Sequence, residues 1–418
     1  MPRSGPKRLL ADPGFRLLFT ADAFSQAASR ILVLALPLVA ISGLGSSAAQ
    51  VGFLTACLTV SPLVIGLPAG AWVDRMRRRP IMVLADIVRA AALLSVPTAW
   101  WLGALTMWQL YAVALVTGVS TVFFDVGYQS YLPHLVGRDH LVEANSQLQA
   151  IASVSAVGGP SLGGLLIQAV TAPYAVAVNA LGFLASGCFL AGIRKPEPRP
   201  ATTAGSSLWP EVMGGIRFVI GHPLLWRIAA SAAIFNLATS ASDIALLVLL
   251  AGDLDLPPGT IGLFFALAGL GGLTGAVLAG RVARRLDPRP AMIAGLSLAA
   301  PCAFALPFAQ SDWRLWVVGT VQAVLAAGAV IFNVNQVSLR QMLCPDEMLG
   351  RMNATMRMAV WGTVPLGSVL GGFLGTYVGV RPAIVIAAGI LTISLGPLLI
   401  GGTPRVTVQA PPRNEPQD

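Results

Sequence analysis

Residues 70–80 read GAWVDRMRRRP and hold five charged side chains within the six positions from Asp74 to Arg79. This stretch separates two long apolar runs, 48–70 and 80–102, in a chain of which only 11% is charged. Soluble domains carry about 25% charged residues. A short charged loop between two apolar segments, each long enough to cross a bilayer, predicts a hairpin of membrane-spanning helices.

The same alternation of apolar segments and short polar loops runs through the whole chain of 418 residues, of which 55% are hydrophobic. A helix needs roughly 20 mostly apolar residues to span a bilayer. Twelve such segments lie at approximately 16–42, 48–70, 80–102, 106–127, 143–168, 172–193, 227–250, 259–280, 290–309, 314–335, 352–378 and 382–402. The runs are continuous, unlike the alternating strands of a membrane barrel. We therefore predict an all-α membrane protein without a soluble catalytic domain.

The net charge of +9 fits a membrane topology better than a nucleic-acid partner. With the N-terminus placed in the cytoplasm, 23 of the 27 Lys and Arg residues fall on the cytoplasmic side or in the cytoplasmic ends of the spans. Arg314 and Arg381 face outside, while Arg30 and Arg89 lie within spans. This bias follows the positive-inside rule and predicts that both termini are cytoplasmic. We expect a multi-pass protein of the cell's inner or plasma membrane, with the lipid bilayer but no nucleic acid as a partner.

The spans divide into two sets of six around a polar, Pro-rich connection. We predict an N-terminal bundle over 1–193, a cytoplasmic linker over 194–226, a C-terminal bundle over 227–405 and a disordered tail over 406–418. Within the linker, the apolar residues Leu208, Val212, Ile216 and Val219 recur at helical spacing, which predicts a short helix lying on the membrane surface.

The two sets of spans also resemble each other in sequence. Three pairs recur at an offset of 208 residues: Asn145 with Asn353, Gly163-Gly164 with Gly371-Gly372, and Asp125 with Asn333. This repeat predicts two bundles related by a pseudo-twofold axis along the membrane normal, an arrangement in which transporters hold substrate between the halves.

Four motifs, in order over residues 9–402, resemble the major facilitator superfamily of transporters. GAWVDRMRRRP resembles the loop signature G-x-x-x-D-R-x-G-R-R at Gly70, Asp74, Arg75, Arg78 and Arg79, with Arg77 where Gly is usual. GGPSLGG resembles the fifth-span signature of antiporters at Gly159, Pro160, Gly163 and Gly164, although the upstream Ser155 replaces an expected Gly. YLPHLVGRDHLVEAN and EVMGGIRFVIGHPLL resemble the branch with enterobactin-type siderophore exporters and macrolide-efflux proteins.

The resemblance implies a gating role for the loop at 70–80. Its arginines are explained by topology and by anionic lipid headgroups, but Asp74 is not. A carboxylate at this position can dock against the N-terminus of another helix. The resemblance implies that this partner is span eleven, which begins near Met348 to Asn353, and that the contact closes the inner side. The matching loop of the second half, GRVARRLDPRP, has Arg284 in place of Asp74, so the gate is predicted to be asymmetric.

Ionisable groups inside spans usually face the bundle interior or a water-filled cavity. Asp22, Gln26 and Arg30 share one face of the first span, and span seven carries Asn236 and Asp243. Aligning RILVLALPL with DIALLVLL places Arg30 and Asp243 at corresponding positions, so the two are expected to meet across the central cavity. We interpret them as a coupling site in which Asp22 or Asp243 takes up and releases a proton. The alternative is a permanent structural salt bridge.

Two other sets of charges are interpreted as structural. Asp86 and Arg89 lie three residues apart and are expected to satisfy each other within one helix. Asp125 is expected to anchor a helix end, and Arg357 to reach the membrane surface. The glycines of GGPSLGG also have a pure packing interpretation. Span four has no early Arg of the kind that drug antiporters often carry, which leaves the proton route open.

Several function classes are disfavoured by simple observations. A P-loop needs Lys followed by Ser or Thr, but Lys7 and Lys195 precede Arg8 and Pro196. The four cysteines and three histidines show no metal-ligand spacing, so no metal or other cofactor is expected. We predict a non-enzymatic, monomeric secondary transporter, a proton-coupled antiporter exporting amphipathic small molecules by alternating access. The alternatives are an importer or symporter, a lipid transporter on the same fold, and a non-transporting membrane sensor.

Overall fold

The computed structural model describes residues 9–137, 140–195, 197, 208–345 and 348–400. Within these residues, twelve helices are long and apolar enough to cross a membrane, which confirms the predicted number of spans. The predicted tail at 406–418, and most of the linker before the surface helix, lie outside the described residues.

The helices of the N-terminal half are α1 (Pro13–Leu38), α2 (Ala48–Thr59), α3 (Ser61–Asp74), α4 (Arg78–Trp101), α5 (Met107–Val136), α6 (Leu141–Val170) and α7 (Ala172–Ala191). The connecting helix is α8 (Leu208–Gly221). Those of the C-terminal half are α9 (Pro223–Val248), α10 (Pro258–Arg285), α11 (Pro288–Ala303), α12 (Arg314–Leu343), α13 (Leu349–Trp361), α14 (Thr363–Tyr377), α15 (Val380–Ile393) and α16 (Gly396–Leu399). Helices α2 and α3 together form one interrupted span, and so do α13 and α14. In each case a proline, Pro62 or Pro365, lies just after the interruption and disfavours a continuous helix.

The structural repeat is tighter than the sequence motifs indicate. Helices α1 and α9 both have 26 residues, start 210 positions apart, and continue into five-residue π-helical segments at Val39–Gly43 and Leu249–Asp253. Helices α5 and α12 both have 30 residues and start 207 positions apart. The two six-helix bundles predicted from the repeat are therefore present.

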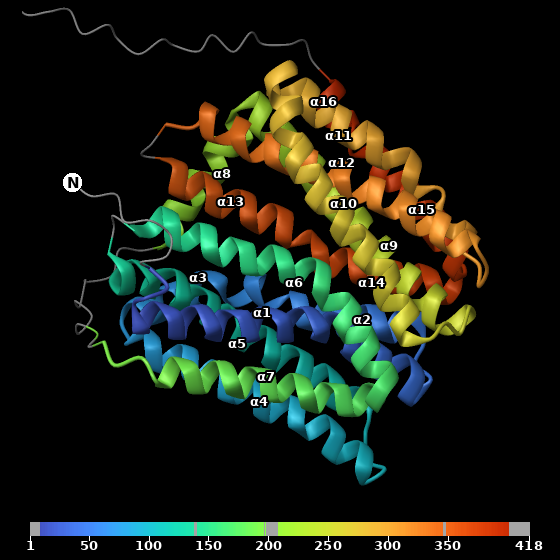
Figure 1. Ribbon diagram of the computed structural model, residues 1–418. Coiled ribbons are helices and arrows are strands. Elements are labelled where there is room, and N and C mark those ends of the chain that lie inside the picture. Colours follow the sequence, from blue (N-terminus) through green and yellow to red (C-terminus); the bar gives the residue numbers. More distant parts are fainter. Residues whose placement is uncertain (1–8, 138–139, 196, 198–207, 346–347, 401–418) are drawn as a thin grey trace, which may run out of the picture.

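The helices run between two ends of the molecule. We call the end with the α3–α4, α5–α6, α10–α11 and α12–α13 junctions the terminal end, because α1 also begins there; the opposite end is the far end. In Figure 1 the N-terminal half lies below the C-terminal half, and the two halves come together on the right, where α2 meets α14. The interface between halves is made mainly by α2 with α14 and by α6 with α10.

Two glycine pairs allow the halves to touch at the far end. A Cβ atom added to Gly164 would lie 2.9 Å from Gly262 Cα, and one added to Gly52 would lie 3.0 Å from Gly372 Cα. Real Cβ atoms do not come this close, so only glycine permits these two helix contacts. Gly52 and Gly262 are 210 residues apart, and Gly164 and Gly372 are 208 residues apart, so the repeat relates each glycine of one pair to a glycine of the other pair. This is the symmetry expected of a pseudo-twofold axis.

The connecting helix α8 belongs structurally to the C-terminal half. A Cβ added to Gly215 would lie 2.7 Å from the Arg351 carbonyl oxygen, so α8 and α13 pack backbone to backbone. Val219 joins Met352 and Met356 in a small buried apolar cluster. The helix predicted from spacing is present, and Val219 on its apolar face is buried against α13, while a position on the membrane surface stays a prediction.

Candidate functional site

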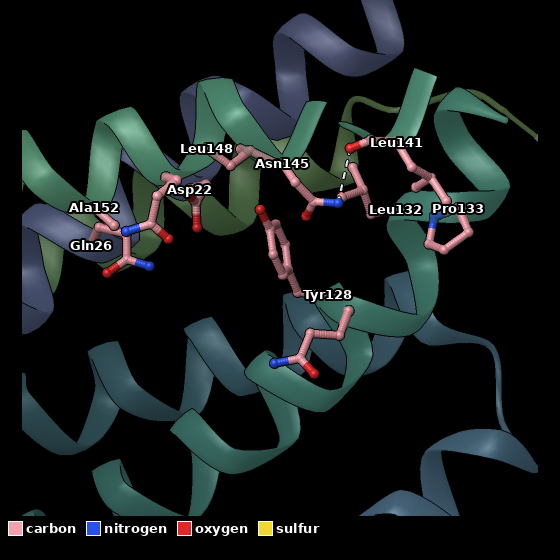
Figure 2. A pocket seen from close by; sticks show the side chains of 11 residues that line it. Asp22, Gln26, Tyr128, Leu132, Pro133, Leu141, Asn145, Leu148 and Ala152 are labelled. Atoms are coloured by element: carbon pink, nitrogen blue, oxygen red, sulfur yellow. Dashed lines mark hydrogen bonds between the residues drawn. The ribbon is translucent and has the colours of Figure 1, made fainter. Parts of the chain in front are cut away.

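A cavity with a volume of about 490 Å³ lies between α1, α5 and α6, in the part of the N-terminal half nearer the terminal end (Figure 2). Asp22 is the only charged side chain among the described residues that line it. Five others are polar and uncharged: Gln26, Tyr128, Gln129, Asn145 and Gln149. The cavity is therefore a polar pocket with a single carboxylate, inside a bundle that is otherwise apolar.

Helix periodicity places Asp22 and Gln26 together in this cavity. The two residues are one turn apart on α1, and both side chains line the cavity. Asp22 is only 3% exposed, yet its side chain faces the cavity. Figure 2 shows Tyr128 extending from α5 toward the helices that carry Asp22 and Asn145. The Asn145 side chain donates to the Leu141 carbonyl at 2.9 Å, which holds the start of α6 at the cavity edge.

The predicted pairing of Arg30 with Asp243 is not formed. Within the part of the chain that the structure describes, neither side chain has an ion-pair partner. The offset of 210 between α1 and α9 places Arg30 opposite Ser240 and Asp243 opposite Val33, so the alignment that related the two charges is wrong by three residues. Short apolar segments such as RILVLALPL match many registers, and the helix ends set the correct one.

The two predicted partners instead have separate surroundings. Arg30 is exposed, and its Cβ lies against α6, where a Cβ on Gly159 would overlap it. Asp243 is also exposed and lines a small space within the C-terminal half, together with Thr239 of α9 and Gln322 of α12. Asn236 donates to the Ala232 carbonyl of its own helix at 2.8 Å. Of the five predicted cavity residues, the structure brings only Asp22 and Gln26 into one cavity.

A second carboxylate, Asp125, lies close to the cavity and was missed as a site residue. It interacts electrostatically with Asp22 from its position on α5, and Tyr128 interacts with both acids. Asp125 also interacts with Arg89 and with Arg357 of α13, which lies in the other half. Both Asp125 and Arg357 are exposed. Asp125 lies within α5, eleven residues before the helix ends at Val136, so the expectation that it anchors a helix end is wrong. That Arg357 reaches the membrane surface stays a prediction.

The ion pair of Asp86 with Arg89 is present, as predicted from their spacing. Both side chains are buried, at 0% and 1% exposure, and the guanidinium donates to the Asp86 carboxylate. The Arg89 guanidinium carbon lies 4.5 Å from the Phe124 ring centre and 4.3 Å from that of Phe183. This cation–π sandwich helps to offset the cost of burying the charge.

The arginines of the loop at 70–80 have specific partners in addition to their topological role. Arg79 donates to the carbonyl oxygens of Leu190 and Ala191 at the end of α7, a favourable place for a cation. Glu197 accepts from the backbone N–H groups of Arg78 and Arg79, at 2.8 and 3.3 Å, and pairs with the Arg78 side chain at 3.6 Å. Its carboxylate thus caps the start of α4.

The gating contact itself stays a prediction. The side chain of Asp74 lies outside the described part of the structure, so its docking on the start of α13 is not tested. Arg75 is exposed, and among the described residues a Cβ added to Gly70 would meet no atom within 4 Å.

The glycines of GGPSLGG serve packing in this structure. Gly159 and Gly163 bring α6 against Arg30 and Ile31 of α1, and Gly164 forms the contact with Gly262 of α10. The Pro160 carbonyl lies at the same contact, where a Cβ on Gly262 would overlap it. Close helix approach explains the spacing of this motif, and the antiporter role implied by the resemblance stays a prediction.

Comparison with known proteins agrees with this geometry. Residues 6–409 match the profile of a family described as transmembrane secretion effector. The enterobactin exporter EntS of Salmonella typhi is 28% identical over 97% of this chain and 96% of its own length.

Two solved structures share the fold. A bacterial homologue of the iron transporter ferroportin, in an inward-facing state, has a TM-score of 0.76 and 16% identity, with 92% of this chain and 97% of that chain covered. A structure of such a homologue in an outward-facing state has a TM-score of 0.58 and 17% identity, with 92% and 98% covered. The chain is therefore a multi-pass membrane protein that belongs to the transmembrane secretion effector family of major facilitator superfamily transporters.

Proposed function

We propose that this protein is a secondary active transporter that exports small molecules by alternating access, driven by proton antiport, with both termini in the cytoplasm. The observation that supports it best is the difference between the two ends of the interface. Gly164 with Gly262, and Gly52 with Gly372, hold the halves together at the far end. At Gly66 and Gly70, near the terminal end, an added Cβ would meet no atom of the described residues within 4 Å.

This difference describes one state of an alternating-access cycle. Two bundles whose closest contacts lie toward one end can rock about the shared interface and close the other end. The distribution of arginines supports the cytoplasmic assignment of the terminal end. On that assignment the structure is open to the cytoplasm, the side from which an exporter loads. The higher TM-score to the inward-facing ferroportin homologue agrees with this orientation.

The composition of the cavity favours a solute with polar groups. Five lining side chains offer hydrogen bonds to a ligand, and a volume of about 490 Å³ lies within the range of small-molecule sites. The apolar composition of the spans predicts an amphipathic solute, and the cavity adds that its polar part binds near Asp22. The name of the Salmonella relative supports export as the direction.

Asp22 is the group we propose for proton coupling. It is buried, it lines the cavity near the terminal end, and its carboxylate can take up a proton when that end is open. An ionisable group inside a membrane bundle is expensive to maintain unless it has a function. Asp243, the other predicted carrier, lies in the C-terminal half outside this cavity.

The test is transport in proteoliposomes with an imposed pH gradient and a panel of amphipathic solutes. We expect gradient-dependent accumulation of at least one solute by the wild type, and loss of that accumulation in Asp22→Asn with the fold intact. Asp312→Asn, which changes an exposed far-end carboxylate, is the matched control and should transport normally. Unchanged accumulation by Asp22→Asn would remove Asp22 from coupling, and no gradient dependence for any solute would contradict proton antiport.

A further inference from the structure

A small polar space lies inside the C-terminal half, where α9, α11, α12 and α15 pack together. Its volume is about 10 Å³, close to what one water molecule needs. Four of its lining side chains carry oxygen atoms: Thr239, Ser242 and Asp243 of α9, and Gln322 of α12. The other described residues that line it are apolar. The space is therefore a compact group of oxygen atoms within an apolar core.

Two of these side chains have buried oxygen atoms without a hydrogen-bond partner. Ser242 is 7% exposed and Gln322 is 6% exposed. Among the described residues, neither Ser242 Oγ nor Gln322 Oε1 has a hydrogen-bond partner. An unsatisfied buried polar atom is destabilising, and most such atoms in folded proteins have a partner. Because both atoms line the same space, a species bound there would supply the missing partner to both.

The charge of Asp243 is also uncompensated. Asp243 lies one turn after Thr239 on the same face of α9, and within the described part of the chain it forms no ion pair. No Lys or Arg is among the described residues that line the space. A carboxylate inside a membrane bundle is expensive to maintain without a partner or a function. Asp243 is exposed, so the core does not enclose its carboxylate on every side.

The sequence repeat shows that the fold does not need oxygen atoms at these positions. Ser242 corresponds to Leu32 at the offset of 210 residues that relates α9 to α1. Gln322 corresponds to Ala114 at the offset of 208 residues between matched positions of the repeat. Leu32 and Ala114 are buried, at 2% and 0% exposure. The N-terminal half therefore packs apolar side chains where the C-terminal half has two unpartnered oxygen atoms.

We infer that this space binds a single dehydrated Na⁺ ion, with the Asp243 carboxylate as its charged ligand. The other ligands are the hydroxyl oxygens of Thr239 and Ser242 and the side-chain carbonyl oxygen of Gln322. Carboxylate and carbonyl oxygens suit hard cations of this kind. The Thr239 hydroxyl donates to the Phe235 carbonyl at 3.0 Å, which leaves its oxygen free to accept. One positive charge would neutralise the carboxylate and satisfy both buried oxygen atoms.

Other occupants fit this space less well. Its volume excludes an organic solute. A water molecule would satisfy Ser242 and Gln322 but would leave the carboxylate without a cation. Ca²⁺ takes more oxygen ligands and Mg²⁺ keeps several of its waters. No cluster of three or more His, Cys, Asp or Glu side chains that could hold a metal occurs among the described residues. Bound Na⁺ would join α9 to α12 inside the C-terminal half, whether or not the protein exports a solute.

Binding of radioactive Na⁺ to the full chain, purified in detergent, tests the site directly. A scintillation proximity assay measures the bound ion, and choline chloride keeps the ionic strength constant because choline is too large for the space. We expect saturable binding of a single Na⁺ per chain. Because a ligand that binds only the folded state stabilises it, replacing choline chloride by NaCl should raise the midpoint of thermal unfolding by at least about 2 °C.

Variants assign the binding to this space. Asp243→Asn should weaken Na⁺ binding by roughly tenfold to a hundredfold, since it removes the charged ligand. Ser242→Ala and Gln322→Leu should each weaken it by roughly threefold to tenfold, the range for a neutral ligand. Asp312→Asn, which changes an exposed carboxylate outside this space, is the matched control and should bind Na⁺ like the wild type.

The outcomes separate the Na⁺ site from the proposed function. Saturable binding that is weakened in Asp243→Asn but kept in Asp22→Asn would support the site, even if no solute moves in proteoliposomes. No saturable binding by the wild type, or binding by Asp243→Asn within twofold of wild type, would overturn it and leave water as the occupant. If thermal unfolding shows that Asp243→Asn does not fold, binding within twofold of wild type by both Ser242→Ala and Gln322→Leu would overturn it as well.

Discussion

The two halves of the molecule share one helix plan but differ in what their cores contain. Helices α4 and α11 start 210 residues apart, so Asp86 and Arg89 correspond to Leu296 and Ala299. All four side chains are at most 1% exposed. The same pair of core positions therefore holds a buried ion pair in one half and apolar side chains in the other. The bundle does not need the ion pair for its fold.

The difference extends to the rest of the site. Asp22 corresponds to Ala232, and Asp125 to Asn333, so the N-terminal half has acids where the C-terminal half has neutral residues. By contrast, Gln26 corresponds to Asn236, and the far-end glycines correspond in pairs. The repeat retains the close contacts on which both halves depend and has diverged in charge. We interpret the N-terminal half as the half that binds, and the C-terminal half as its partner in gating.

The largest expected effect comes from breaking the buried ion pair on one side. Arg89→Met leaves the buried Asp86 carboxylate without its ion-pair partner, which should reduce the free energy of unfolding by about 3–5 kcal/mol. Asp86→Leu combined with Arg89→Met should recover most of this loss, since an apolar pair of similar volume is often as stable as the ion pair. Denaturant unfolding in detergent measures both.

Leu296→Met in the other half is the control for this comparison. A volume-conserving change in an apolar core should cost less than about 1.5 kcal/mol. If the double variant is no more stable than Arg89→Met, then the N-terminal half depends on charge at these positions for its stability, and the equivalence of the two cores would be contradicted.

An intermediate effect is expected from the far-end glycines. A leucine at Gly164 would overlap the Pro258 and Gly262 backbone, so Gly164→Leu should open the far end and reduce transport by at least about tenfold. The symmetry-related Gly372→Leu should have a similar effect through α2. The state is measured by labelling a cysteine introduced at Asn236 with a membrane-impermeant thiol reagent, in a background without the native cysteines.

The control for the glycine variants is Gly389→Leu on α15, where an added Cβ meets no atom within 4 Å. It should leave both transport and labelling unchanged. Strong inhibition by only one member of the Gly164 and Gly372 pair would show that the two far-end contacts are not equivalent, although the helix plan relates them.

The smallest effect is expected from Arg30 and Asp243. Because no ion pair joins them, the exchange of charges in Arg30→Asp with Asp243→Arg should not rescue the single variants. The effects on transport should add within about 0.5 kcal/mol, as for independent sites. A coupling energy above about 1 kcal/mol, measured by a double-mutant cycle in proteoliposomes, would show that the two charges meet in another state of the cycle.

Much of the architecture follows from the sequence, because membrane insertion depends on properties that are additive along the chain. The number of spans follows from runs of apolar residues, each of which must satisfy its own backbone hydrogen bonds within a helix. The pairing of Asp86 with Arg89 follows from a spacing of three residues on one helix. The linker helix follows from its apolar spacing.

The site was only partly accessible to the same reasoning. Asp22 and Gln26 lie on one helix, and their shared face follows from periodicity. Asn145, Gln149 and Tyr128 come from two further helices, and no local pattern distinguishes a polar side chain that faces a cavity from one that faces water at a helix end. Asp125 and Arg357 are 232 positions apart and lie in different halves, so no local pattern in the sequence indicates how they are placed relative to each other.

The sequence by itself determined that this protein is a membrane bundle of twelve helices in two repeats, because hydropathy, charge bias and periodicity are read along one chain. Only the tertiary structure decided which charges meet. Helix register and the rotation of each helix about its axis are set by side-chain packing against neighbours, and an error of three residues was enough to relate Arg30 to the wrong partner. The closed far end likewise depends on glycines of four helices brought together in space.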